Sequence, residues 1–117
     1  MLKLEGQEKN LSELIKNCMR EIIEAVNNNK YEEEKINIAN NLEKINLFTS
    51  KPELVALMTE ETEFPPALTK LTEMTLNDPD NNSNLNENLL NNEIALLKKI
   101  CDSINDPYNS LLVVEYL

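Results

Sequence analysis

Apolar residues recur along most of the chain at the three-to-four-residue spacing of amphipathic helices. Asn10 is suited to be the N-cap of the clearest of these segments, with Glu13 three residues later in a capping-box arrangement. The asparagines at 27–29 are expected to end it. The spacing predicts a helix with one buried face. The apolar residues on that face are Leu11, Leu14, Ile15, Cys18, Met19, Ile22, Ile23 and Val26.

Three more helices are predicted between residues 31 and 76. The first spans 31–48 and opens on three glutamates, whose negative charge favours a helix N-terminus. The second is short, with Ser50 as its expected N-cap and Pro52 in its first turn. An acidic loop over 59–63 is expected to follow it. The third helix then begins at Phe64, which is followed by two prolines that favour a helix start.

A polar stretch over 78–87 precedes the last two predicted helices. The final one, over 108–117, is apolar on nearly all sides and therefore needs neighbours in a bundle or in a longer chain. A short strand over 111–117 is the alternative, but the sequence predicts no strand to pair with it. The apolar stripe of the long helix before it is Leu90, Ile94, Leu97, Cys101 and Ile104.

A polar phrase containing proline follows successive helical segments. Asn-Asp-Pro ends at Pro79 and again at Pro107, so these prolines are 107 − 79 = 28 residues apart. Pro52 lies 79 − 52 = 27 residues before the first of them. Helices and turns at a fixed period are typical of stacked helical repeats. We therefore expect Asp78 and Asp106 to be N-caps of helices that begin at the prolines that follow them.

With these elements in place, the chain resembles armadillo/HEAT-type repeat proteins from about Ile38 onward, and residues 53–58, Glu-Leu-Val-Ala-Leu-Met, look like the short middle helix of an armadillo unit. The resemblance implies an all-α fold of stacked antiparallel helices, an armadillo/HEAT-like α-solenoid fragment, with a concave surface for a partner. The alternative is a compact helical bundle of five to six helices. Residues 1–117 are expected to form a single domain, either complete or the N-terminal fragment of a longer repeat protein.

Composition removes several kinds of chemistry. The chain has no histidine, the commonest general base and metal ligand, so neither an enzyme nor a cofactor is expected. The oxygen-rich string at 78–89 departs from a calcium loop, because Ser83 stands where glycine is needed and Leu89 where glutamate is needed. No apolar run approaches the ~20 residues of a membrane span. A cytoplasmic protein is expected, with Cys18 and Cys101 as buried thiols.

Charge narrows the choice of partner. The net charge is −10, and Arg20 is the one arginine, so direct binding to nucleic acid is not expected. Residues 50–93 hold nine acidic residues and two lysines, a charge of 2 − 9 = −7, which favours a basic partner. The chain is therefore predicted to be a non-enzymatic protein–protein interaction module, an adaptor, scaffold or regulatory domain without a small-molecule substrate. The alternative is a small acidic inhibitor or nucleic-acid mimic of viral or phage type. The residues expected to contact a partner are Glu60, Glu61, Glu63, Glu73, Leu111, Leu112 and Tyr116.

Overall fold

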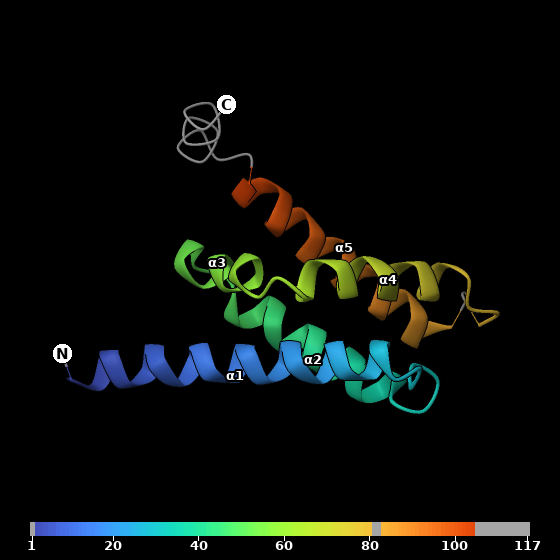
Figure 1. Cartoon of the computed structure of the whole chain (residues 1–117), viewed down its shortest axis with the longest axis horizontal. Helices are drawn as coiled ribbons and strands as arrows, with labels where there is room; N and C mark the ends of the chain where they lie inside the picture. The colour runs from blue at the N-terminus through green and yellow to red at the C-terminus, as the bar shows by residue number, and fades with distance from the viewer. Residues whose placement is uncertain (1, 81–82, 105–117) are drawn as a thin grey trace.

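The computed structural model describes residues 2–80 and 83–104, which form five α-helices and contain no strand. They are α1 (Leu2–Asn27), α2 (Lys35–Phe48), α3 (Pro52–Glu60), α4 (Phe64–Leu76) and α5 (Asn84–Ile104). The predicted all-α class is confirmed. The packing of the five helices into one compact unit fits the bundle alternative (Figure 1).

The chain runs back and forth, so two of its connections lie at the same end of the molecule. In Figure 1, α1 runs along one edge, α2 returns beside it, and α4 leads back toward the α1–α2 connection. The α4–α5 connection therefore lies near the α1–α2 connection, and hydrogen bonds join the two. This end of the bundle brings together residues more than 40 positions apart in the sequence.

One hydrophobic core is shared by all five helices. The apolar stripe predicted for α1 faces this core, except that Leu14 is exposed and Leu11 is half-buried. The largest fully buried side chains are Ile15, Met19 and Ile22 of α1, Ile38, Leu42 and Ile45 of α2, Met58 of α3, Phe64, Leu68 and Leu71 of α4, and Leu89 and Leu96 of α5.

The starts of the first two helices differ from the prediction. Helix α1 begins at Leu2, so Asn10 lies inside the helix and does not cap it. Helix α2 begins at Lys35 and not at Tyr31, because the Tyr31 side chain turns into the core, where 7% of the residue is exposed. Asn29, at a φ of 56°, provides the left-handed residue that ends α1 and starts this connection.

The observed start of helix α3 agrees within one residue with the start predicted from Pro52. The N-cap position is Lys51 and not Ser50, and no side chain caps the first turn. The Lys51 carbonyl accepts hydrogen bonds from the N–H groups of Leu54 and Val55. The helix continues to Glu60, so the acidic loop predicted over 59–63 is reduced to residues 61–63.

The prediction that Asp78 caps a helix beginning at Pro79 is wrong. Pro79 lies in a turn, and α5 begins 84 − 79 = 5 residues later. The cap is Ser83, whose Oγ accepts the N–H of Asn86 at 3.2 Å. Asp78 is unavailable as a cap because its carboxylate binds side chains from other segments. The corresponding Asp106 and Pro107, and the helix predicted over 108–117, lie outside the described residues.

Helix α5 buries a different face from the one predicted. Of the predicted stripe, Ile94 is 52% exposed, Cys101 is exposed, and Leu90 and Leu97 are half-buried. The predicted burial of Cys101 is therefore wrong, whereas that of Cys18 is confirmed. Two polar residues belong to the face that is buried, and the predicted apolar stripe does not include them. That face consists of Asn86, Leu89, Glu93, Leu96 and Ile100.

A lysine from α5 completes the C-terminal end of α2. Helix α2 has no basic residue in its own last turn. The Lys99 Nζ donates to the Asn46 carbonyl at 2.9 Å and to the Thr49 Oγ1 at 3.2 Å. A cation at this position interacts favourably with the helix dipole. Burial lowers the pKa of Lys99.

Candidate functional site

Five side chains form a buried polar cluster where the two connections meet. Its members are Tyr31, Lys35, Thr75, Asp78 and Glu93. The Lys35 Nζ lies 2.6 Å from the Asp78 Oδ2, and Tyr31 donates its hydroxyl hydrogen to the same oxygen at 2.9 Å. The Lys35 ammonium also lies 5.5 Å from the centre of the Tyr31 ring, within the range of a cation–π contact. These contacts tie α2 and both connections together.

The Asp78 carboxylate is the centre of this arrangement. Its other oxygen, Oδ1, accepts the backbone N–H of Asp80 at 2.9 Å, which shapes the turn that contains Pro79. The Lys35 ammonium first, and then the Asp80 N–H, hold the pKa of Asp78 well below its usual range. Burial raises the pKa of Tyr31. Asp78 is therefore ionised and Tyr31 is neutral near pH 7.

Glu93 occupies the other half of the cluster and is fully buried. Its Oε2 lies 2.8 Å from the Thr75 Oγ1, and burial raises the pKa of Glu93 to about 8. Its Oε1 has no hydrogen-bond partner among the described residues. The Asn86 amide lies on the side of Asp78 and helps to lower the pKa of that carboxyl. Because Glu93 is closed off from solvent, its contact with Thr75 acts on the stability of the fold.

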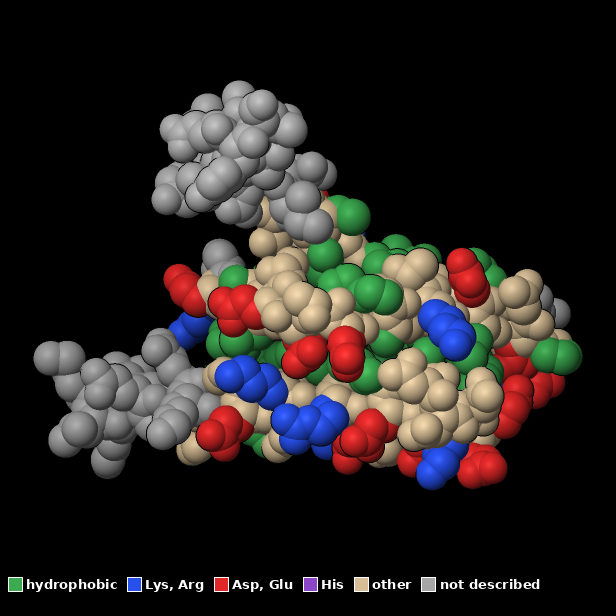
Figure 2. All heavy atoms as spheres, in the orientation of Figure 1, with side chains coloured by type: hydrophobic (Ala, Val, Ile, Leu, Met, Phe, Trp, Pro, Cys, Tyr) green, Lys and Arg blue, Asp and Glu red, His purple; other side chains and the backbone are tan. Residues whose placement is uncertain are grey.

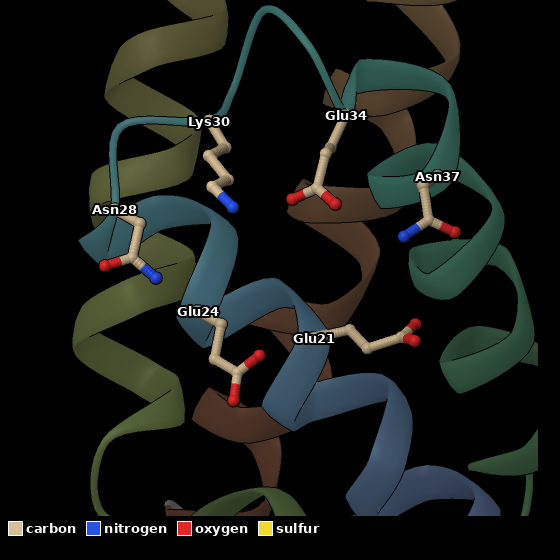
Figure 3. A pocket seen from close by; sticks show the side chains of 6 residues that line it. All are labelled: Glu21, Glu24, Asn28, Lys30, Glu34 and Asn37. Carbon is tan, nitrogen blue, oxygen red and sulfur yellow. The ribbon is translucent and has the colours of Figure 1, made fainter.

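An acidic cleft lies on the surface between α1 and α2. Its volume is about 150 Å³, and it holds three carboxylates and one ammonium, a charge of 1 − 3 = −2. Figure 3 shows the side chains of Glu24, Lys30 and Glu34 directed toward the same space. The described part of the chain shows no ion pair between Lys30 and these carboxylates. The lining residues are Glu21, Glu24, Asn28, Lys30, Glu34 and Asn37.

A hydrogen bond from α2 holds the Glu21 carboxylate of this acidic cleft in place. The buried Asn41 of α2 donates from its Nδ2 to the Glu21 Oε2 at 2.7 Å. This bond crosses from α2 to α1 and limits the rotamers that Glu21 can adopt. The second oxygen of Glu21 is left for another donor.

The predicted partner-binding glutamates lie on the surface, and two of them share a hollow. Glu60 and Glu61 line a space of about 230 Å³ between α1 and α3, together with Lys16, Met19 and Leu57. We call this space the α1–α3 hollow. Figure 2 shows acidic side chains interspersed with Lys and Arg over one face, and hydrophobic side chains between the helices.

The remaining predicted residues do not join the α1–α3 hollow. Glu63 is exposed just before α4, and Glu73 is exposed ten residues later. At a rise of 1.5 Å per residue, Glu63 and Glu73 are about 15 Å apart along the axis of α4. Leu111, Leu112 and Tyr116 lie outside the described residues.

A third depression separates α2 from α5. This groove has a volume of about 540 Å³ and is lined by Asn40, Glu43, Lys44, Asn46, Leu47 and Asn92. The Asn46 Nδ2 donates to the carbonyl of Asn92 at 3.1 Å and to its Oδ1 at 2.9 Å, which closes the groove floor. Leu47 is 72% exposed. The charges here are mixed, so the groove has no clear electrostatic preference.

Sequence reasoning missed both the acidic cleft and the buried polar cluster. The spacing of Glu21 and Glu24 showed that they share the polar side of α1, but nothing in the sequence indicated that Glu34 would lie opposite them. A signal for the buried polar cluster was present in α5, where Glu93 has the helical spacing of Leu89, Leu96 and Ile100. That register places a carboxyl group on the core side.

No protein-family model, curated protein or solved structure matches the chain. In the parts of the chain that the structure describes, no helix is long and apolar enough to cross a membrane. Within the same residues, no group of three or more acidic or cysteine side chains is arranged to hold a metal ion. The functional interpretation therefore depends on the geometry of the surface.

Proposed function

We propose that this domain is a non-enzymatic binding module that takes up a basic segment of a partner protein. The observation that carries the proposal is the acidic cleft, where Glu21, Glu24 and Glu34 surround a space of about 150 Å³. A space of this size suits the ammonium or guanidinium group of one partner side chain. Hydrogen bonds to ionised groups are the strongest of the polar contacts available to such a side chain.

Two features of the acidic cleft favour binding over simple solvation. The bond from Asn41 pre-positions Glu21, so less side-chain entropy is lost when a cation binds. Lys30 is free of an ion pair in the described structure, and it can move aside for a partner cation. The α1–α3 hollow offers a second contact, where the half-buried Leu57 can take the aliphatic stem of a lysine or arginine beside Glu60 and Glu61.

The alternative of a nucleic-acid mimic has less support. A mimic of a phosphate backbone needs regular rows of carboxylates, whereas Lys30 interrupts the acidic cleft and Lys16 interrupts the α1–α3 hollow. The armadillo/HEAT-like stacking remains part of our proposal. The resemblance of residues 53–58 supports it, whereas the packing of α2 on α5 and of α1 on α4, and the position of Pro79 outside a helix, are points against strict repetition.

The test measures binding of a synthetic arginine-rich peptide by isothermal titration calorimetry at two salt concentrations. The variant Glu21→Gln/Glu24→Gln/Glu34→Gln removes three charges from the acidic cleft. We expect its affinity to fall by at least about tenfold, the loss of one charge-assisted contact of about 1.5–3 kcal/mol. The matched control Glu13→Gln/Glu53→Gln/Glu87→Gln removes three exposed charges elsewhere and should change affinity by less than about threefold.

Equal losses in the two triple variants would show that the peptide responds to net charge alone, and absence of binding by the wild type would also refute the proposal. The second contact is tested by Glu60→Lys/Glu61→Lys/Glu63→Lys. These three side chains are exposed, so the variant should fold and should bind the peptide with a slower association rate. An unchanged association rate would remove the α1–α3 hollow from the contact surface.

A further inference from the structure

The hydroxyl of Thr75 lies between two hydrogen-bond acceptors. Its Oγ1 is 3.0 Å from the Leu71 carbonyl and 2.8 Å from the Glu93 Oε2. A hydroxyl group has a single hydrogen and can donate to one of them at a time. The Tyr31 hydroxyl lies closer to Asp78 than to Thr75, so its hydrogen is already used. With Glu93 ionised, one short contact would therefore join two acceptors.

A proton on Glu93 resolves this arrangement. The neutral carboxyl donates from its Oε2 to Thr75, and Thr75 donates to the Leu71 carbonyl, so each short contact has one donor and one acceptor. An ionised Glu93 has no such solution. Among the described residues its one hydrogen-bonded donor is Thr75, and the Asn86 amide is directed to the Asp78 carboxylate, where it helps to lower the pKa of that group.

Among the residues that the structure describes, no free cation is bonded to Glu93. Lys35 is paired with Asp78, and Lys99 is bonded to the end of α2, so neither ammonium compensates a charge on Glu93. Asp78 is itself negative and would oppose a second negative charge nearby. The buried or half-buried titratable groups on α5 and on the segments packed around it are Tyr31, Glu34, Lys35, Asp78 and Lys99. The others are exposed: Lys30, Glu32, Glu33 and Asp80 on the connections, Glu43 and Lys44 of α2, Glu53 and Glu60 of α3, Lys70 and Glu73 of α4, and Glu87, Lys98, Cys101 and Asp102 of α5.

We infer that Glu93 is protonated in the folded domain and donates its hydrogen to Thr75, so that the packing of α5 against α4 depends on pH. Loss of this proton places an uncompensated charge between the two helices and turns the Thr75 hydroxyl away from Leu71. The contact is thus strongest in weakly acidic solution. It weakens as the solution becomes alkaline, which makes α5 the helix whose docking responds to pH.

The direction of the pH dependence follows from burial. The pKa of Glu93 is about 8 in the folded state, against an ordinary value of 4.5. Below pH 4.5 both states hold the proton, and burial carries no ionisation penalty. Between pH 4.5 and pH 8 the unfolded chain loses the proton while the folded chain keeps it, so stability falls as pH rises. Above pH 8 both states are ionised, and the loss is complete.

The experiment compares urea unfolding of the wild type, Glu93→Gln and Glu87→Gln at pH 5, 7 and 9. Glutamine keeps the shape of Glu93 and can donate to Thr75, but it does not ionise. The unfolding constant of the wild type relative to Glu93→Gln should rise by roughly two to three orders of magnitude between pH 5 and pH 9. Glu87 is exposed on the same helix, so its variant should follow the wild type.

The same pH dependence in the wild type and Glu93→Gln would overturn the inference. A second measurement on the wild type avoids any dependence on the variant folding. The side-chain carboxyl carbon of Glu93 is followed by NMR across the pH range in protein labelled with carbon-13. Titration of Glu93 near pH 8 supports the inference, and titration of Glu93 near its ordinary value of 4.5 would refute it.

Discussion

The ion pair between Lys35 and Asp78 provides a quantitative test of the buried polar cluster. The Asp78 side chain is 1% exposed and that of Lys35 is 11% exposed, so each charge depends on the other for compensation. Removing one partner of a buried pair costs about 3–5 kcal/mol. We expect Lys35→Met to cost less, about 2–3 kcal/mol, because Tyr31 and the Asp80 N–H still donate to Asp78.

Substitution of the other partner, Asp78, should reduce the free energy of unfolding by less. Asp78→Asn keeps an acceptor for Tyr31, and the unpaired Lys35 ammonium can extend toward solvent along its aliphatic stem. A cost of about 1–2 kcal/mol is expected. The double variant removes both charges and should cost about 1–2 kcal/mol, less than the sum of the single variants. The resulting coupling energy is about 2 kcal/mol, within the range for contacting residues.

Urea denaturation followed by far-UV circular dichroism at pH 7 measures all three variants. The pKa of Asp78 is lowered from an ordinary value of 3.8, chiefly by Lys35, so the contribution of the pair is present above that pH and is lost as pH falls below it. The coupling energy should therefore decrease in strongly acidic solution. Additive single and double variants at pH 7, with a coupling below about 0.5 kcal/mol, would refute this account of the cluster.

Two further predictions concern the core and the start of α5. Ile22→Ala and Leu71→Ala should each cost about 2–5 kcal/mol, because both residues are fully buried, whereas Leu97→Ala at a half-buried position should cost about 1–2 kcal/mol. Chemical denaturation measures these losses, and equal losses at all three positions would contradict the assigned faces of the helices. Ser83→Ala should cost about 1 kcal/mol through loss of the N-cap. Asp80 is exposed, so the variant Asp80→Ala serves as the control and should stay within about 0.5 kcal/mol of the wild type. A larger loss of stability in Asp80→Ala than in Ser83→Ala would show that Ser83 is not the cap.

The helices themselves could be predicted because their signals are local. The stripe from Ile15 to Val26 and the prolines after Phe64 depend on neighbours within one or two turns, and both elements are present in the structure. The ends of helices were less predictable, because long-range contacts decide them. Asp78 has the sequence features of an N-cap, but Lys35, 43 residues earlier, binds its carboxylate.

The candidate site was predictable only in part for the same reason. Exposure of Glu60, Glu61 and Glu63 follows from their polar neighbours and is observed. The approach of Glu34 to α1 depends on how the α1–α2 connection bends, which no local pattern specifies. Glu93 was counted in the acidic stretch that favours a basic partner, but it is buried. The free energy gained by burying the apolar side chains around it places this carboxyl in the core.

The bond from Lys99 to the end of α2 has a consequence for synthesis of the chain. Asn46 and Thr49 are translated about 50 residues before the lysine that binds them. At roughly 5–20 residues per second, this interval lasts on the order of three to ten seconds. During that time the Asn46 carbonyl lacks its lysine partner, although the Ile45 carbonyl is already bonded by Thr49, and the side of α2 that receives α5 is uncovered. Helix α2 therefore has its complete set of partners only after α5 has been synthesised and has docked.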